Sequence, residues 1–235
     1  LGTHTESLVG RKCKIAAASW PAGPAFEGGG VRCGMPALDG AIERVSLDAE
    51  GRASLKVIGD APVQGLCGSG LIDLLGELRR TDRMNEYGRL QDGQNEFLVD
   101  AERRIGLSEE DISQLAQAKG ANMAGLRIAL EQYGVDFQQL DRFYLAGGFA
   151  RHIDLAAAKR IGLIPNLPDE KIVRIGNASL EGTAMALLSV TRRKALEEAA
   201  KAVHHIELET HPRFFDYFVE ACQYLPVETH ALQND

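Results

Sequence analysis

The segment from Phe143 to Ala150, with the sequence FYLAGGFA, constrains the fold of this chain more than any other. Its apolar first half is typical of a buried strand, and a glycine pair then ends it. Gly147 and Gly148 carry no Cβ, so another group can approach their backbone closely. A helix expected next would present free N–H groups at the same place. This order predicts a nucleotide-binding turn, although a simple strand-to-helix turn would show the same pattern.

Composition bounds the class of protein. A chain of 235 residues, 45% hydrophobic and 25% charged, can bury the core of one large or two small domains. The net charge of -7 argues against a nucleic-acid partner, and no apolar run is long enough to predict a membrane span. The N-terminus lacks signal-peptide character, and the four dispersed cysteines fit a reducing compartment. We therefore expect a cytoplasmic protein without nucleic-acid or membrane partners.

Hydrophobic periodicity predicts two regions, mainly β over 1–64 and α/β over 65–235. Strands are expected at 6–9, 14–18, 41–47, 53–58, 97–99, 143–146, 171–175 and 205–208. Helices are expected from 69, at 108–119, 123–133, 153–160, 180–188 and 192–202, and from 210. Ser69 and Ser108 are the expected N-caps of the first two helices. This order predicts an α/β, ribonuclease-H-like mixed sheet with helices on both faces, which would be half of an actin/Hsp70-type ATPase domain.

Glycine-containing turns recur at the predicted junctions between elements. They are Gly2–Glu6, Gly65–Gly70, Gly147–Gly148 and Gly176–Ser179. In an α/β sheet such junctions line one rim, where ligands bind at the carboxyl ends of strands. Each turn alone could be only a cap, but together they predict a phosphate or nucleotide site. Glu27, beside three glycines, is interpreted as a loop carboxylate rather than a residue of the cleft.

These turns and several other motifs resemble the C-terminal region of the reductive activators of corrinoid proteins. The motifs are GTHTE at 2–6, AGPAFEG at 22–28, RCGM at 32–35, GLCGSGLID at 65–73, LAGGF at 145–149 and GNA at 176–178. The ending from His205 to Pro226 also resembles that family, so the likeness spans essentially the whole chain. Members carry an N-terminal 2Fe–2S domain, a linker and an ATPase domain of the actin/Hsp70/sugar-kinase (ASKHA) type. They use ATP to drive electrons from the cluster to a Co(II) corrinoid, giving the Co(I) form needed for methyl transfer.

The resemblance implies that residues 1–235 are the C-terminal ASKHA subdomain. It implies ATP and Mg²⁺ as cofactors and a corrinoid protein as partner. It also implies that the 2Fe–2S cluster and the first half of the ATPase domain belong to N-terminal regions outside this chain. A homodimer is left open. The aspartate that usually precedes the second phosphate loop would fall before residue 1, so we do not expect this chain to hydrolyse ATP alone.

Individual candidate residues follow from the same resemblance, and no residue is assigned as catalytic or as a metal ligand. Gly2, Thr3 and Glu6 match the second phosphate loop, in which His4 and Thr5 replace the usual Asn and Gly. The other candidates are Gly147 and Gly148 in the adenosine loop, Lys119 and Asn122 as ribose or adenine contacts, Gly68, Ser69 and Gly70 in a helix-opening turn, and Asn177. The alternatives are structural: a solvated helix face for Lys119 and Asn122, and a turn or cap for the rest.

Three other functions stay open at this point. One is an activator of 2-hydroxyacyl-CoA dehydratases, although its cluster is shared by cysteines across a dimer and the cysteines here do not suit that arrangement. Another is a non-catalytic module that docks a corrinoid protein or senses nucleotide. The third is a fragment of a sugar or acetate kinase, for which the sequence offers no well-placed general base.

Overall fold

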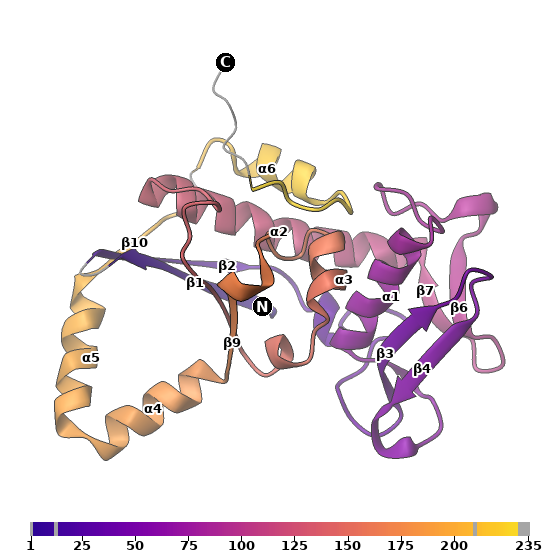
Figure 1. Cartoon of the computed structure of the whole chain (residues 1–235), viewed down its shortest axis with the longest axis horizontal. Helices are drawn as coiled ribbons and strands as arrows, with labels where there is room; N and C mark the ends of the chain where they lie inside the picture. Colours follow the sequence, from indigo (N-terminus) through magenta and orange to yellow (C-terminus); the bar gives the residue numbers. More distant parts are fainter. Residues whose placement is uncertain (1, 12–13, 209–210, 230–235) are drawn as a thin grey trace.

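The protein is described by a computed structural model that covers residues 2–11, 14–208 and 211–229 (Figure 1). These residues form six α-helices, two three-stranded sheets and two strand pairs. The predicted α/β class is therefore confirmed. None of the helices in this part of the chain combines the length and apolar character that a membrane span requires.

The first sheet is mixed, as predicted. β1 (His4–Arg11) runs antiparallel to β2 (Lys14–Pro21), and β10 (Val203–His205) runs parallel to β2. The side chains that β1 and β2 bury lie under α2 (Glu109–Tyr133), which contacts both strands. They are Thr5, Val9, Ala16, Ala18 and Trp20.

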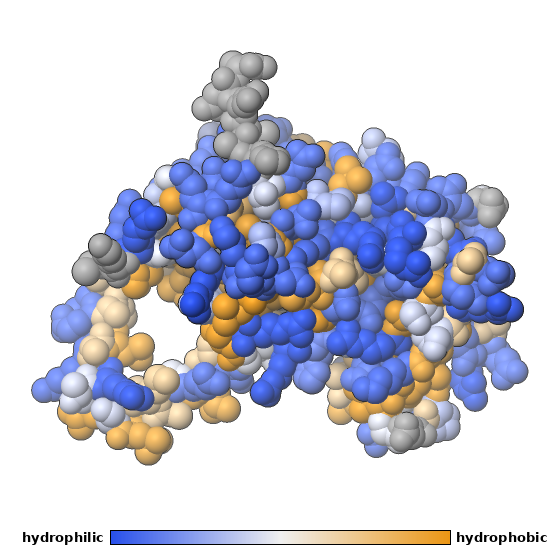
Figure 2. Space-filling view, in the orientation of Figure 1, coloured by the Kyte–Doolittle hydropathy of each residue, from blue (hydrophilic) through white to orange (hydrophobic). Residues whose placement is uncertain are grey.

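Two helices connect the end of β9 (Ile172–Gly176) to β10 of this sheet, along a path that extends away from the rest of the fold (Figure 1). α4 (Ala178–Leu188) and α5 (Val190–Ala202) contain no buried residue. Figure 2 shows apolar surface along both helices. Their exposed large apolar side chains are Leu180, Met185, Leu187, Leu188, Val190 and Leu196.

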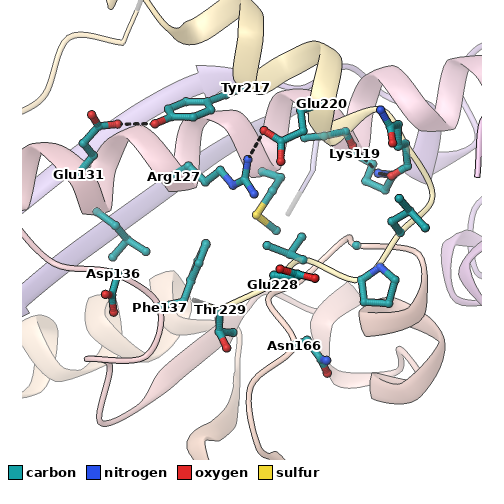
Figure 3. A pocket seen from close by; sticks show the side chains of 18 of the residues that line it. Lys119, Arg127, Glu131, Asp136, Phe137, Asn166, Tyr217, Glu220, Glu228 and Thr229 are labelled. Carbon is teal, nitrogen blue, oxygen red and sulfur yellow. Dashed lines mark hydrogen bonds and ion pairs between the residues drawn. The ribbon is translucent and has the colours of Figure 1, made fainter. Parts of the chain in front are cut away.

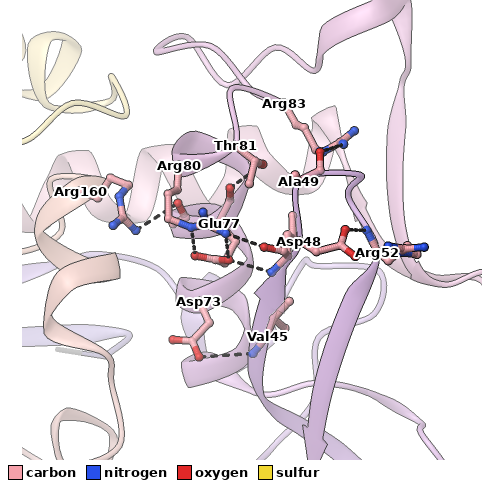
Figure 4. Close-up of polar contacts among 12 residues, drawn as sticks. Val45, Asp48, Ala49, Arg52, Asp73, Glu77, Arg80, Thr81, Arg83 and Arg160 are labelled. Atoms are coloured by element: carbon pink, nitrogen blue, oxygen red, sulfur yellow. Dashed lines mark hydrogen bonds and ion pairs between the residues drawn. The ribbon is translucent and has the colours of Figure 1, made fainter.

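The second sheet has the order β4 (Ala53–Val57), β3 (Ala41–Leu47), β5 (Gly65–Leu66), and α1 (Gly68–Arg80) packs on it. Buried carboxylates join helix to strand (Figure 4). Asp73 accepts from the Val45 amide at 3.4 Å and Glu77 from the Leu47 amide at 2.7 Å. Burial raises the pKa of Asp73 to about 6, because its desolvation outweighs the nearby Arg44 guanidinium.

Two strand pairs complete the architecture. β6 (Glu96–Asp100) and β7 (Ile105–Ser108) form an antiparallel hairpin. β8 (Phe143–Ala146) and β9 (Ile172–Gly176) are parallel, and α3 (Leu155–Arg160) lies between them in sequence and packs on α1.

The C-terminal part of the chain packs on the other side of α2. α6 (Phe214–Ala221) lies along this helix (Figure 1), and the segment after it is anchored by Tyr224. The Tyr224 hydroxyl donates to the Ile112 carbonyl at 2.6 Å, its amide donates to the Glu86 carbonyl at 2.7 Å, and the residue is fully buried. Its carbonyl also accepts from Arg79 at 3.0 Å, so one residue ties the C-terminal segment to both α1 and α2.

Most predicted elements are present, with some corrections near glycines. Ser69 was predicted as the N-cap of α1, but the helix already begins at Gly68. Cys67 occupies the N-cap position and makes no capping hydrogen bond with its side chain. Ser108 does cap α2 and forms the predicted capping box with Asp111. The two helices expected at 108–119 and 123–133 are one, because Gly120 permits close approach of α6 instead of breaking the helix: a Cβ there would lie 2.7 Å from Cys222 Sγ.

Two strands and one helix start also differ from expectation. β7 was not predicted, since its glycine interrupts the alternation; a Cβ at Gly106 would lie 2.0 Å from the Phe97 carbonyl oxygen. β10 occupies 203–205, earlier than the expected 205–208. The predicted helix start at Thr210 lies outside the described residues, and α6 begins at Phe214.

Two helical glycines give opposite expected effects on stability. A Cβ at Gly125, within α2, would lie 2.5 Å from the Trp20 ring, whereas a Cβ at Gly182, within α4, would have no neighbour within 4 Å among the residues that the structure describes. We expect Gly125→Ala to destabilise the protein by roughly 1–3 kcal/mol through overpacking. We expect Gly182→Ala to stabilise it by about 0.5–1 kcal/mol through helix propensity. Denaturant unfolding of both variants measures the two free energies, and equal effects would contradict this packing of α2 on the sheet.

Candidate functional site

Two of the predicted glycine turns lie side by side. β8 ends at Ala146 and its parallel neighbour β9 ends at Gly176, and the Gly147 amide donates to the Gly176 carbonyl at 2.5 Å. Gly147 and Gly176 have φ values of 105° and 63°, which favour glycine. Among the described parts of the chain, no atom lies within 4 Å of a Cβ built at either of them or at Gly148, so the backbone here is open to a ligand.

The helix α4 begins directly after this pair of turns. Asn177 is its N-cap, and the Asn177 side chain accepts from the Leu180 amide at 3.0 Å. The positive end of the α4 dipole therefore lies next to Gly176. Asn177 therefore caps the helix, which was the structural alternative for this residue. In this position it also lies beside the glycine pair.

The predicted phosphate loop opens β1 and is attached to the loop after β2. The Thr3 carbonyl accepts from the amides of Ala22 and Gly23 at 2.9 and 3.2 Å. Glu6 accepts from the Ser19 hydroxyl at 2.7 Å, across the register that pairs these two residues. A Cβ at Gly2 would lie 3.0 Å from Glu27 Oε1, so that carboxylate lies against the turn.

Glu27 is an exposed loop carboxylate, as predicted, but its position beside Gly2 was not predicted. It ends a short 3₁₀ helix, Ala25–Glu27, that contacts both α1 and α2. Its approach to Gly2 depends on the hydrogen bonds between Thr3 and the loop after β2, and no local pattern reveals these. The sequence signals for this residue were its place in the AGPAFEG motif and the three glycines that follow it.

The turn at Gly68, Ser69 and Gly70 is buried within the packing of α1 on β3. A Cβ at Gly70 would lie 2.2 Å from the Ile42 carbonyl oxygen. The Ser69 hydroxyl lies 3.4 Å from Cys67 Sγ. Close packing of the helix on β3 therefore accounts for the glycine at position 70, and all three residues are buried away from the open glycine turns.

Lys119 and Asn122 are buried rather than on a solvated helix face. The Lys119 amine donates to the carbonyls of Ala221 and Gln223 and lies 5.1 Å from the centroid of the Tyr224 ring. Burial lowers the pKa of Lys119 to about 7. Asn122 accepts from the Thr5 hydroxyl at 2.5 Å. Both side chains have hydrogen-bond partners within the protein, which accounts for them as parts of the core.

A cavity of about 930 Å³ lies between α2, α6 and the C-terminal segment (Figure 3). Two of its cations are paired with carboxylates: Arg127 with Glu220 at 2.8 Å, and Arg213 with Glu131 at 3.4 Å. Asp136 and Glu228 add further acidic groups to the lining. Several of its other walls are apolar, with Met123, Leu130, Val135 and Phe137 among the lining residues. Lys119 lines it, but the glycine turns do not. This cavity therefore lacks the surplus of cationic groups that would favour a triphosphate.

Comparison with known proteins decides the family. The family model described as "C-terminal domain of RACo the ASKHA domain" matches residues 1–234. The chain belongs to this family. The resemblance inferred from the motifs, the ASKHA class and the nucleotide-binding character of the domain are thereby confirmed.

Individual relatives agree with this assignment. The chain is 31% identical over 243 residues to the corrinoid activation enzyme RamQ of Eubacterium limosum, a match that covers 93% of the chain and 41% of RamQ. It is 26% identical over 257 residues to a [Co(II) methylated amine-specific corrinoid protein] reductase of Methanosarcina barkeri, covering 97% and 46%. A solved structure of a reductive activator for corrinoid,iron-sulfur protein matches with a TM-score of 0.86 at 35% identity, covering 95% of the chain and 38% of that protein. The chain thus spans less than half the length of these relatives.

The buried amine of Lys119 gives an expected pH dependence of stability. Its folded pKa of about 7 lies below the value of about 10.4 usual for an unfolded chain, so between these values only the unfolded state holds the proton. Stability should therefore rise with pH in this window, by up to roughly 1.4 kcal/mol per pH unit. The unfolding free energy of wild type should rise with pH from 6 to 10 more steeply than that of Lys119→Met, and the difference between the two should show this slope. The exposed Lys201→Met is the control, and parallel profiles for wild type and Lys119→Met would contradict the assignment.

Proposed function

We propose that this chain forms one wall of the Mg-ATP site in an ATP-dependent activator that reduces Co(II) corrinoid proteins. The observation that carries the proposal is the pair of open glycine turns at the ends of β8 and β9, beside the start of α4. Backbone N–H groups and a helix N-terminus suit phosphate or adenosine groups, and glycine removes the side chains that would keep a ligand away. Family membership supports the same ligand.

Within this site each element would have a distinct part. Gly147 and Gly148 would lie against the adenosine, while the Gly2–Thr3 turn would lie against the phosphates. Glu6, held by Ser19, would keep the first residues of β1 in register with β2. Bound Mg-ATP supplies the free energy of hydrolysis, and the residues of this chain bind and orient it.

The corrinoid step is proposed from the relatives. Both curated relatives are named for action on corrinoid proteins, which favours a corrinoid partner over a 2-hydroxyacyl-CoA dehydratase. We propose that the electron comes from a 2Fe–2S cluster in a region of the protein outside this chain. Nucleotide binding can promote the transfer only if two states of the complex differ in nucleotide affinity. A cytoplasmic location remains a prediction, and the oligomeric state is left open.

The open turn at Gly147 has a matched control elsewhere in the chain. Gly134, the C-cap of α2, also has a positive φ, and in the described part of the chain no atom lies within 4 Å of a Cβ there. Changing either glycine to alanine should destabilise the protein to a similar extent, about 1 kcal/mol or more, through backbone strain. We expect only Gly147→Ala to weaken ATP binding, by about tenfold or more, as measured by calorimetric titration of the natural-length protein. Equal affinity of the two variants would contradict an adenosine site at this turn.

The activity itself has a direct spectroscopic test. We expect the reduced natural-length protein to convert a Co(II) corrinoid protein to the Co(I) form in the presence of Mg-ATP. The visible absorption of the corrinoid reports this change under anaerobic conditions. A non-hydrolysable ATP analogue should bind but leave Co(II) largely unchanged. ATP binding without any cobalt reduction would instead favour the non-catalytic module.

A further inference from the structure

Glu27 is the acidic side chain that lies against the predicted phosphate turn. Its Oε1 atom would lie 3.0 Å from a Cβ built at position 2, so the carboxylate occupies the space beside Gly2 that a larger side chain would need. Among residues 2–11, 14–208 and 211–229, no hydrogen bond or ion pair to this carboxylate is present. Both of its oxygens are therefore available to accept hydrogen bonds from a ligand on the turn.

The position of Glu27 is set by its neighbours rather than by contacts of its own side chain. Ala25 and Phe26 are buried, and the Glu27 amide donates to the Pro24 carbonyl at 3.0 Å. Gly28 then leaves the short helix with a φ of 90°, and a Cβ there would lie 2.6 Å from the Met35 amide nitrogen. The loop is consequently fixed against the rest of the fold while the carboxylate stays exposed.

A carboxylate beside a phosphate turn has a definite electrostatic consequence. Two anions at short range repel each other unless a cation lies between them. Mg²⁺ bound with a nucleotide takes phosphate oxygens, waters and one or two carboxylates, and keeps several of its waters. The described residues contain no group of three acidic, His or Cys side chains that could hold a metal, and nucleotide-bound Mg²⁺ does not require one. A single carboxylate at this turn fits that donor set.

We propose that Glu27 binds the hydrated Mg²⁺ of Mg-ATP, by accepting hydrogen bonds from its water shell, and thereby makes nucleotide binding depend on the metal. The inference rests on the proposed ATP site and adds a residue to it. Glu27 is a positioning residue in this role, because it holds the metal and its phosphates against the Gly2–Thr3 turn. It also supplies a carboxylate on this chain near the place that the resemblance gives to an aspartate before residue 1.

The test compares ATP affinity with and without Mg²⁺ in the natural-length protein. Calorimetric titrations are run in excess Mg²⁺ and in EDTA for wild type, Glu27→Gln and Glu27→Asp. For Glu27→Gln we expect Mg-ATP affinity to fall by about 10–100-fold, the effect typical of residues that support a bound metal. Affinity for metal-free ATP should be unchanged or higher, since a repelling charge is removed. Glu27→Asp keeps the charge and should retain part of the preference for Mg-ATP.

The controls separate this inference from the proposed function. Glu102→Gln removes the same charge from the exposed β6–β7 turn and should leave both affinities unchanged. If wild type fails to bind Mg-ATP, the proposed function itself fails. If wild type binds and Glu27→Gln weakens ATP equally with and without Mg²⁺, Glu27 contacts the nucleotide directly and the inference is overturned. Unchanged affinities for Glu27→Gln would overturn it as well.

Discussion

The packing of α2 on both of its sides is the constraint on which the rest of this structure depends. On one side Trp20 lies over Gly125 and Thr5 is hydrogen-bonded to Asn122, which fixes the sheet that carries the Gly2–Thr3 turn. On the other side Gly120 admits α6. A helix buried on both sides needs small residues wherever a neighbour approaches, because protein interiors are close-packed. The glycines of α2 therefore serve packing rather than flexibility.

The same helix explains why a lysine can be buried here. The Lys119 amine has two carbonyl partners in the C-terminal segment, and a neutral amine can still donate to both. Loss of the proton consequently removes the cost of burying a charged ammonium group, and both hydrogen bonds are kept. Together with Tyr224, this residue joins the chain after α6 to the core, so the C-terminal segment closes one side of the fold and stays outside the glycine-lined site.

Local sequence patterns predicted the elements well where local physics decides them. The capping box at Ser108, the strand at 143–146 and the strand pair at 41–57 follow from caps and alternation, and the structure contains all three. The errors at Gly106 and Gly120 arise because a glycine interrupts the local pattern and is then read as a break. At both positions glycine is instead required because a residue distant in sequence packs closely against the backbone. The glycine turns of the site could be predicted from the sequence, but the burial of individual side chains could not. Nothing local distinguishes Lys119 inside the core from a lysine on a solvated face, and nothing local brings Glu27 to Gly2.

The two halves of the proposed site are attached to the fold in different ways, and this has a mechanical consequence. The Gly2–Thr3 turn belongs to the sheet that α2 covers, whereas the glycine pair belongs to β8 and β9, whose connecting helix α3 packs on α1. Among the described residues β1 pairs with β2 alone, and β8 with β9 alone, so no strand pairing fixes the separation of the two turns. A nucleotide that contacts both turns gains its full affinity only at one separation. It therefore favours that arrangement over others, which is the differential affinity that an ATP-driven change of state requires.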